Sequence, residues 1–372
     1  MHGAGQCRWT GALKVLYVCK AVDESSPVLA NQVRWIRALA RQPGVDEVRV
    51  LTPRRGRADL PPGVTVHPFG SRPPLQVARA SARFYARLAR VVRGVDLAFV
   101  AQGGHYPALL LPWKLVSRRP VYQWKAMPHI SARMRFYARY CDDLVFTATP
   151  GSFPLAGDSV RVVGHGIDTE LFAAPHPGAP APGRDLVTVT RIAPVKRLEE
   201  MIRAVAEVRR RFGRAPGLDI VGACDARSQD HRRHLLQVID ALDLGASVRL
   251  VGAVEQARLP ALLADYRATL NFAETAFDKA AGEAMASGLP VLTTNPRVAE
   301  VVPAELHPEL VLAAGDPVAQ AEAIHQALSW GEATRTSIGE RLRQAVVDHH
   351  SLDALFAKIL AAHRHLVVQR GR

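Results

Sequence analysis

The segment LVTVTRIAPVKRLEEMIRAVAEVRRRFGRAPGLDIV, residues 186–221, decides the fold class. Residues 186–191 and 218–221 are short runs dominated by apolar side chains, which predicts two buried strands. Residues 198–212 between them predict a helix. A strand, a helix and a strand in this order form the unit of a parallel sheet that is covered by helices.

The same alternation extends along the chain in both directions from this segment. Further strands are predicted at 13–19, 48–52, 64–68, 96–100, 120–124, 144–148, 248–251, 269–272 and 290–293. Further helices are predicted at 28–40, 75–92, 131–140, 229–242, 259–265, 281–286 and 352–365. The sequence therefore predicts an α/β protein with two Rossmann-like, doubly wound parallel sheets.

A proline-rich segment separates the two sheets. Residues 173–185, AAPHPGAPAPGRD, hold four prolines and two glycines, which neither a helix nor a central strand accepts. We expect domains at 1–172 and 186–347, with a last helix at 348–372 that packs back toward the first domain. Ligands of open parallel sheets bind beyond the carboxyl ends of the strands, so the active site is expected in an interdomain cleft.

The charge is unevenly distributed along the chain. The 372 residues carry 48 Lys and Arg against 34 Asp and Glu, a net charge of +14. Residues 1–172 hold 24 basic and 11 acidic residues, whereas residues 173–372 hold 24 and 23. The first half is therefore expected to meet an anionic partner, such as a membrane surface or a phosphorylated lipid. Nucleic acid is not an expected partner, because no recognisable binding module occurs.

The expected location is the cytoplasm. The longest apolar stretch, residues 106–116, is interrupted by two prolines and a lysine and is too short to span a bilayer. The first residues lack the pattern of a secretory signal. The four cysteines are far apart in the sequence and form no CxxC pair, which favours a reducing compartment. They are Cys7, Cys19, Cys141 and Cys224.

Several enzyme classes are disfavoured by missing motifs. No G-x-G-x-x-G follows the first predicted strand, and no GxxxxGK[ST] occurs, which argues against nicotinamide dehydrogenases and P-loop nucleotidases. No D-x-D occurs, so the simplest metal clamp for a nucleotide sugar is missing. His231 and His234 are interpreted as a solvated helix face. We therefore predict neither a cofactor nor a metal site.

Two basic residues suggest a site for a diphosphate. Arg191 follows the strand at 186–191 and Lys196 precedes the helix at 198–212. Two fixed cations beside free backbone N–H groups and a helix dipole suit a diphosphate group. Ordinary surface basicity is the alternative interpretation of this pair.

A second candidate site lies in AETAFDKAAGEAMASGLPVLTT, residues 273–294. Small residues in the helix at 281–286, such as Gly282, let the backbone approach a ligand. Lys279 is expected two or three residues before this helix, where a phosphate meets its ammonium and the helix N-terminus. Glu283 lies within the helix, and a buried structural glutamate is the alternative to a binding role.

Four motifs together resemble a known family. GHGIDTELF (164–172), TRIAPVKRLEEMI (190–202), VRLVGAVEQARLPALLADYRATLNFAE (248–274) and EAMASGLPVLTT (283–294) resemble the family-4 retaining glycosyltransferases of the GT-B fold. The resemblance implies a nucleoside-diphosphate sugar donor in the C-terminal domain and a glycan or lipid-linked acceptor on the N-terminal domain. It also implies metal-independent transfer with retention of the anomeric configuration.

The resemblance also assigns roles to individual residues. It implies that Arg191 and Lys196 hold the donor diphosphate and that Glu283 binds the ribose, as the second glutamate of the family's E-x7-E motif. It implies that His129, in QWKAMPH, is the N-domain histidine near the sugar. The remaining donor-binding positions that are expected from the motifs are Val251, Gly252, Lys279, Ala280 and Ala281.

One departure from the family pattern concerns the first glutamate of E-x7-E. The pattern places it at Thr275, but the glutamate here is Glu274, and the loop continues to an Asp278-Lys279 pair typical of a subgroup. Either Glu274 reaches the sugar through a loop shift, or Asp278 and backbone groups hold the sugar hydroxyls. A non-catalytic GT-B protein that binds sugar nucleotides or acts as a scaffold is therefore the alternative function.

The helix predicted at 75–92 bears on the acceptor. Its arginines share one face, and Phe84 and Leu88 lie on the other side. The arginines are Arg79, Arg83, Arg87 and Arg90. This pattern is typical of a solvated surface helix or of a helix that docks on anionic lipid. The second interpretation suits a lipid-linked acceptor at the inner membrane face.

Overall fold

The computed structural model describes residues 12–26, 29–70, 77–155, 157–173 and 184–370. These residues form two compact units. The first comprises Met1–Ala148, Phe153–Gly166 and Leu352–Arg372, and the second comprises Thr149–Ser152 and Ile167–Ser351. Most of the expected linker, residues 174–183, lies outside the described residues, as do Cys7 and the first residues of the helices predicted at 28–40 and 75–92.

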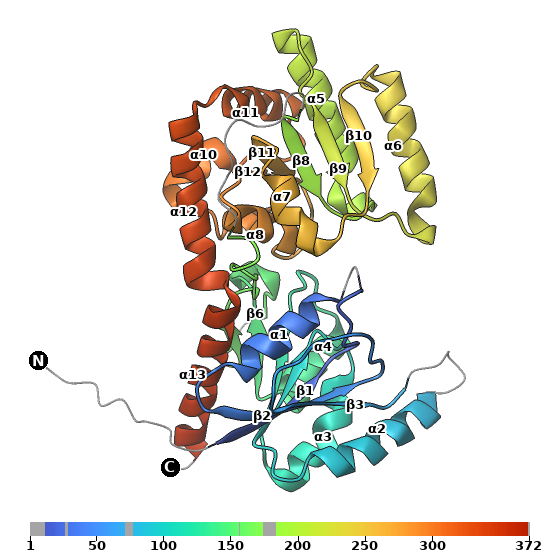
Figure 1. Cartoon of the computed structure of the whole chain (residues 1–372), viewed down its shortest axis with the longest axis vertical. Coiled ribbons are helices and arrows are strands. Elements are labelled where there is room, and N and C mark those ends of the chain that lie inside the picture. The colour runs from blue at the N-terminus through green and yellow to red at the C-terminus, as the bar shows by residue number, and fades with distance from the viewer. Residues whose placement is uncertain (1–11, 27–28, 71–76, 156, 174–183, 371–372) are drawn as a thin grey trace, which may run out of the picture. The chain divides into compact units, whose positions relative to one another are not determined.

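The first unit is built on a seven-stranded parallel sheet with the order β3-β2-β1-β4-β5-β6-β7 (Figure 1). Strands β4, β5 and β6 are buried along their whole length, as expected for the centre of a parallel sheet covered on both faces. The strands are β1 (Leu13–Val18), β2 (Val45–Thr52), β3 (Val64–Pro68), β4 (Leu97–Ala101), β5 (Val121–Trp124), β6 (Leu144–Thr147) and β7 (Val160–Val162).

Helices pack on this sheet, and the last helix of the chain is one of them. Figure 1 shows α13 beside α1, where the rings of Trp35 and Phe356 lie 5.9 Å apart. The helices are α1 (Asn31–Ala40), α2 (Val77–Val91), α3 (Tyr106–Ser117), α4 (Ala132–Phe136) and α13 (Leu352–Arg370). A π-helical turn, Tyr137–Cys141, continues α4.

The second unit contains a five-stranded parallel sheet with the order β10-β9-β8-β11-β12 (Figure 1). Its strands are β8 (Leu186–Val189), β9 (Leu218–Val221), β10 (Val248–Gly252), β11 (Ala268–Asn271) and β12 (Val291–Thr293). Its helices are α5 (Leu198–Phe212), α6 (Gln229–Ala241), α7 (Leu259–Leu263), α8 (Lys279–Ala286), α9 (Pro296–Ala299), α10 (His307–Leu310), α11 (Pro317–Ser329) and α12 (Glu332–His350). The predicted α/β class with two parallel sheets is confirmed.

The strand orders locate one switch point in each sheet. The chain winds outward from β1 in one direction and from β4 in the other, and it does the same from β8 and β11. Right-handed crossovers then place the connecting helices on opposite faces on either side of each switch point. Ligands of such sheets bind beyond the carboxyl ends of the two strands at the switch point. The loops after β8 and β11 are therefore the first place to look for a site.

The backbone turns tightly at Gly166. Its φ is +74°, and a Cβ atom there would lie 2.7 Å from Leu355 Cδ2 and 2.9 Å from Trp35 Nε1. Glycine is required at this position both by the left-handed backbone and by the space available. In the described part of the chain, no helix is long and apolar enough to cross a bilayer.

Candidate active site at the switch point of the second sheet

Arg191 lies two residues beyond the end of β8, at the switch point. Its side chain is exposed and forms neither a hydrogen bond nor an ion pair with the residues that the structure describes. The pKa of Asp225 is lowered mainly by a hydrogen bond from Ser228, and the positive charge of Arg191 lowers it further. Arg191 is thus a cation whose hydrogen-bonding groups are available to a ligand.

The ends of β8, β9 and β10 are held close together. A Cβ atom on Gly222 would lie 1.8 Å from the carbonyl oxygen of Thr190, so only glycine lets these loops approach. The Gly222 N–H donates to the carbonyl of Gly252 at 2.8 Å. Val251 forms a bulge in β10, where the register shifts between Leu250 and Gly252. Val251 and Gly252, two of the predicted donor-binding residues, therefore lie at the same edge of the sheet as Arg191.

Lys196 is joined to the second motif by a buried ion pair. It ends the short 3-10 turn Pro194–Lys196, two residues before α5. Its Nζ lies 2.5 Å from Oδ2 of Asp278, and Asn271 donates to the same oxygen at 3.2 Å. The side chains of Lys196 and Asp278 are only 12% and 9% exposed. The two motifs, 82 residues apart in the sequence, thus form one polar cluster.

The N-terminus of α8 differs from the prediction. Asp278 caps the helix, because its Oδ1 accepts the N–H of Ala280 at 3.2 Å, and the helix begins at Lys279. The prediction that Lys279 precedes the helix by two or three residues is therefore wrong. Ala280 and Ala281 follow in the first turn. The free N–H groups of the first turn belong to this end of α8 and not to Gly282.

Gly282 has a packing role in place of the predicted close approach to a ligand. A Cβ atom there would lie 2.9 Å from the ring of Phe277 and 3.1 Å from Cδ1 of Ile167. The two interpretations could not be separated from the sequence, because both require a small residue at this position.

Glu283 is buried and has two side-chain partners. Its Oε1 accepts hydrogen bonds from Lys279 Nζ, one helical turn earlier, and from Gln256 Nε2 at 2.5 Å. Lys279 is therefore already paired. Gln256 comes from the short turn Gln256–Arg258 after β10 and was not among the predicted site residues. It lies in the same family-like block, residues 248–274, as Val251 and Gly252, which was the available signal.

Glu274 lies outside this polar cluster. Its side chain is 65% exposed, and Oε1 lies 3.3 Å from Nη2 of Arg197. Its backbone N–H donates to the carbonyl of Val195 at 3.0 Å. Of the two carboxylates considered for the sugar, Asp278 is the one that the structure places beside Lys196.

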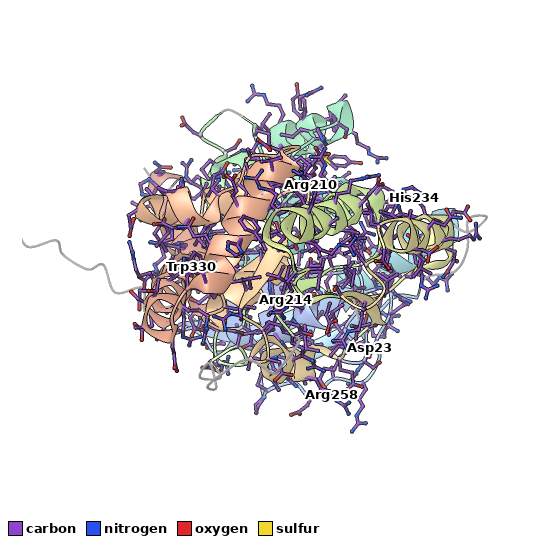
Figure 2. All side chains as sticks on the ribbon, turned by 90° about the horizontal axis from the view of Figure 1, so that it is seen from above. Asp23, Arg210, Arg214, His234, Arg258 and Trp330 are labelled. Carbon is purple, nitrogen blue, oxygen red and sulfur yellow. The ribbon has the colours of Figure 1, made fainter. Side chains whose placement is uncertain are left out.

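His129 belongs to the first unit and His234 to the second. His129 is exposed in the loop after β5 in the first unit, with no hydrogen-bond partner in the ranges described. His234 lies on α6 beside α5, where its Nε2 is 2.8 Å from Oε2 of Glu199 (Figure 2). Among the residues with described positions, no three His, Cys, Asp or Glu side chains form a group suited to a metal ion.

Two of the three predicted cations of this site, Lys196 and Lys279, form ion pairs with carboxylates. Asp278 balances Lys196, and Glu283 balances Lys279, so each lysine is held in place by a carboxylate. Arg191 follows the neighbouring strand β8 and forms no ion pair with the described residues, although its charge acts on Asp225. A ligand with two or more negative charges has there one free guanidinium, two positioned ammonium groups and the N-terminus of α8.

Comparisons with known proteins concern the fold and the second unit. Residues 183–329 match the family described as glycosyl transferases group 1. A sequence comparison with curated proteins finds no match. Among solved structures, HepE of Anabaena, crystallised with UDP and glucose, has a TM-score of 0.72 at 18% identity and covers 95% of this chain and 100% of its own.

Two further solved structures are similar over nearly the whole chain. Sucrose-phosphate synthase from Thermosynechococcus elongatus has a TM-score of 0.70 at 17% identity, covering 96% of this chain and 100% of its own. A glycosyltransferase from Rickettsia africae has a TM-score of 0.73 at 14% identity, covering 95% and 98%. Residues 183–329 thus match the model of the group 1 glycosyltransferases, in a chain that has the two-sheet GT-B fold.

Proposed function

We propose that this protein is a retaining, metal-independent glycosyltransferase that moves a sugar from a nucleoside-diphosphate sugar to a glycan or lipid-linked acceptor. The observation that carries the proposal is that Arg191, which forms no ion pair with the described residues, and Lys196, which is paired with Asp278 at the N-terminus of α8, both follow β8, one of the two strands of the switch point. HepE, which shares the fold, has been crystallised with UDP-glucose. UDP-glucose is therefore the first donor to test.

The donor is proposed to lie along the edge of the second sheet. Arg191 and Lys196 bind its diphosphate, together with Lys279 and the first-turn N–H groups of Ala280 and Ala281. Glu283 accepts from the ribose hydroxyls, while Val251 and Gly252 border the base. Residues 186–347 are then the donor domain and residues 1–172 the acceptor domain. His129 keeps the role that the resemblance implies, near the transferred sugar.

The proposed reaction needs no protein nucleophile. The bond between the anomeric carbon and the β-phosphate oxygen breaks, and the nucleoside diphosphate leaves with the electron pair. The acceptor hydroxyl attacks the anomeric carbon from the same face, and its proton passes to the departing phosphate oxygen. Arg191 and Lys196 stabilise the negative charge that develops on the leaving group, which is where preorganised cations accelerate a reaction.

The sugar hydroxyls are proposed to be held by the Asp-Lys loop. Asp278 is buried beside Lys196, whereas Glu274 is exposed beside Arg197, so Asp278 is the better candidate. Turnover of Asp278→Asn and Glu274→Gln compared with the wild type tests this choice. We expect a loss only in Asp278→Asn. Unchanged turnover in both variants would mean that no carboxylate of this loop handles the sugar.

A non-catalytic sugar-nucleotide-binding protein is the second candidate. It is favoured by the exposed position of Glu274 and by the ion pairs that already occupy both lysines. Thermal shifts with UDP and UDP-glucose, combined with an assay of UDP release, separate the candidates, because a ligand that binds only the folded state raises its stability. Stabilisation with UDP release supports the transferase. Stabilisation without release, over a panel of acceptors, supports the second candidate.

A further inference from the structure

The switch point of the first sheet carries a group of basic residues that the proposed donor site does not use. Lys20 follows β1, His105 follows β4 and Lys125 follows β5, and these three strands are neighbours in the sheet. Arg133 lies on α4, which comes next in the chain. We refer to Lys20, His105, Lys125 and Arg133 as the basic cluster. Parallel strands bring such carboxyl-end residues to one edge of the sheet.

The members of the basic cluster are close enough to act on one another. The pKa of His105 is lowered mainly by burial and then by the positive charges of Lys20, Arg133 and Lys125. The pKa of Lys125 is likewise lowered mainly by burial, and the charges of Lys20 and Arg133 lower it further. Four groups that can carry positive charge thus lie near one another, three of them after neighbouring strands of the sheet.

Lys125 is the unusual member of the cluster. It is 5% exposed, and its ammonium neither donates a hydrogen bond nor forms an ion pair within the described part of the chain. Its backbone N–H is bonded to the carbonyl of Phe146 at 2.8 Å, which fixes the start of the side chain. Lys125 is thus largely buried, but its ammonium is not one of the fully buried unpartnered atoms of the described residues. Partial burial makes a cation more costly to hold, and a bound anion would offset that cost.

The carboxylate of Asp142 acts on Lys125 through its charge but does not accept a hydrogen bond from the ammonium. Asp142 is buried, and neither of its oxygens has a hydrogen-bond partner among the residues described. Burial raises the pKa of Asp142 well above its usual range, although Lys114 and Lys125 act in the opposite direction. The charge of Asp142 therefore raises the pKa of Lys125, but its oxygens form no ion pair with the ammonium.

The backbone beside the cluster is held in a fixed conformation. Gln102, the first residue after β4, has a φ of +58°, which is uncommon for a residue with a side chain. Gln123 donates to the carbonyl of Gly103 at 2.5 Å, and a Cβ atom on Gly103 would lie 2.1 Å from the ring of Tyr106. The loop that carries His105 is thus positioned before any ligand arrives.

We propose that the basic cluster binds a phosphate group of the acceptor substrate. The proposal rests on the proposed function, in which the first unit receives the acceptor. A phosphate ester accepts several hydrogen bonds and carries up to two negative charges, which matches two ammonium groups and a guanidinium. The phosphate belongs either to a soluble sugar or polyol phosphate or to a lipid headgroup.

The test measures binding of glycerol 3-phosphate by calorimetry. The parent protein is the full chain with Arg191→Gln and Lys196→Gln, so that the proposed donor site contributes little. We expect Lys125→Met, which keeps the buried stem, to weaken binding by at least about tenfold, since it removes a charge-assisted contact. Lys20→Gln, at an exposed position, should weaken it by at least about threefold.

Lys14→Met is the matched control. It removes the same charge as Lys125→Met, but Lys14 lies at the other end of β1 from Lys20. We expect it to change the dissociation constant by less than about twofold. Absence of binding to the parent protein, or an equal loss in Lys14→Met, would overturn the proposal. The Lys20→Gln result keeps the test decisive if Lys125→Met does not fold.

Two further experiments follow. One distinguishes a lipid phosphate from a soluble phosphate ester, and the other distinguishes the phosphate site of the basic cluster from the proposed glycosyltransferase function. Sedimentation with vesicles of phosphatidic acid and phosphatidylcholine identifies a lipid phosphate if Lys125→Met loses binding, and a soluble phosphate ester if it does not. If the wild type lacks UDP release but glycerol 3-phosphate binding depends on Lys125, the basic cluster stands and the proposed function fails. If the enzyme turns over with an unchanged acceptor KM in Lys125→Met, the role in acceptor binding fails.

Discussion

At the residue scale, the proposed donor site consists of lysines that are already paired with carboxylates. Asp278 holds Lys196, and Glu283 holds Lys279. These pairs keep the ammonium groups in position, but a diphosphate must compete with the carboxylates for them. Arg191 has no such competitor among the described residues. We therefore expect Arg191 to contribute most to diphosphate binding, and the two lysines to adjust when the donor binds.

Lys279→Ala should distinguish between a phosphate-binding lysine and a structural one. If Lys279 contacts the diphosphate, the variant should bind UDP at least about tenfold more weakly and uridine nearly as well as the wild type. Calorimetric titration with both ligands measures the difference. Arg203→Ala is the control, because Arg203 also pairs with a glutamate four residues away. Equal losses for UDP and uridine would show that Lys279 only supports Glu283.

His363 predicts how stability depends on pH. Burial lowers the pKa of His363 to about 4, and the Tyr122 hydroxyl lies 2.8 Å from its Nδ1. Below about pH 6.5 the unfolded chain binds a proton at this residue, whereas the folded protein does not until about pH 4. The free energy of unfolding therefore decreases as the pH is lowered. Between about pH 7 and 5 the wild type should lose about 2 kcal/mol more than His363→Gln in urea unfolding. Parallel pH profiles would contradict this.

Some residues of the candidate site could be predicted from the sequence, because their positions relative to predicted strands and helices are informative on their own. Arg191 and Lys196 are recognisable from their places after a strand and before a helix, and Asp278 from its loop. Their contacts were not predictable, because Lys196 and Asp278 are 82 residues apart and meet only through the strand order. The bond from Gln256 to Glu283 likewise depends on how the loop after β10 folds.

At the element scale, α12 supports α8, which carries the proposed donor-binding residues. A Cβ atom on Gly339 of α12 would lie 2.1 Å from the carbonyl oxygen of Gly288, just after α8. Arg343 of the same helix donates to the carbonyl of Phe172 at 2.9 Å and also to that of Ala286. The two helices are therefore packed backbone to backbone with little room to move.

Gly339→Ala should destabilise the protein by about 1–3 kcal/mol, because overpacking displaces backbone that cannot move away. Chemical denaturation measures the change in the free energy of unfolding. Gly331→Ala is the control, since Gly331 begins the same helix and has open space around its α-carbon. We expect that variant to stay within about 0.5 kcal/mol of the wild type. Similar stability of the two variants would refute the close contact.

Some helices and strands have the bounds predicted from the sequence, and others do not. Helix α5 and strand β9 have the predicted bounds, because an apolar run is bounded by glycine or proline in each case. Helix α3 was not predicted, since Pro107 and Pro112 argue against a helix, although Pro107 fits its first turn. The start of α8 was misplaced because the cap at Asp278 was not recognised.

At the scale of the whole molecule, the excess positive charge lies in the first half of the sequence. Helix α2 packs Phe84 and Leu88 into the core of its unit, whereas Arg83 and Arg90 are exposed. The side chain of Arg79, which belongs to the predicted arginine face, lies outside the described residues. An interaction of this face with a bilayer is thus electrostatic and reversible, and each basic residue contributes about 1 kcal/mol.

Sedimentation with vesicles of increasing phosphatidylglycerol content tests this docking. Binding of the wild type should rise with anionic lipid and fall with salt. It should drop at least about tenfold when Arg79, Arg83, Arg87 and Arg90 become Gln. Replacing four arginines of the second unit, Arg203, Arg210, Arg233 and Arg258, should leave binding largely intact. A wild type that ignores anionic vesicles at low salt would rule out docking and favour a soluble acceptor.

We propose that Arg191 stabilises the charge that develops on a departing nucleoside diphosphate. The most direct measurement is the rate of UDP release from UDP-glucose by the wild type and by Arg191→Ala. We predict that Arg191→Ala lowers turnover by at least about tenfold, while its melting temperature stays within about 3 °C of the wild type. Arg214→Ala, which removes another exposed arginine of the same unit, should retain turnover. Turnover near the wild-type rate in Arg191→Ala would contradict the account.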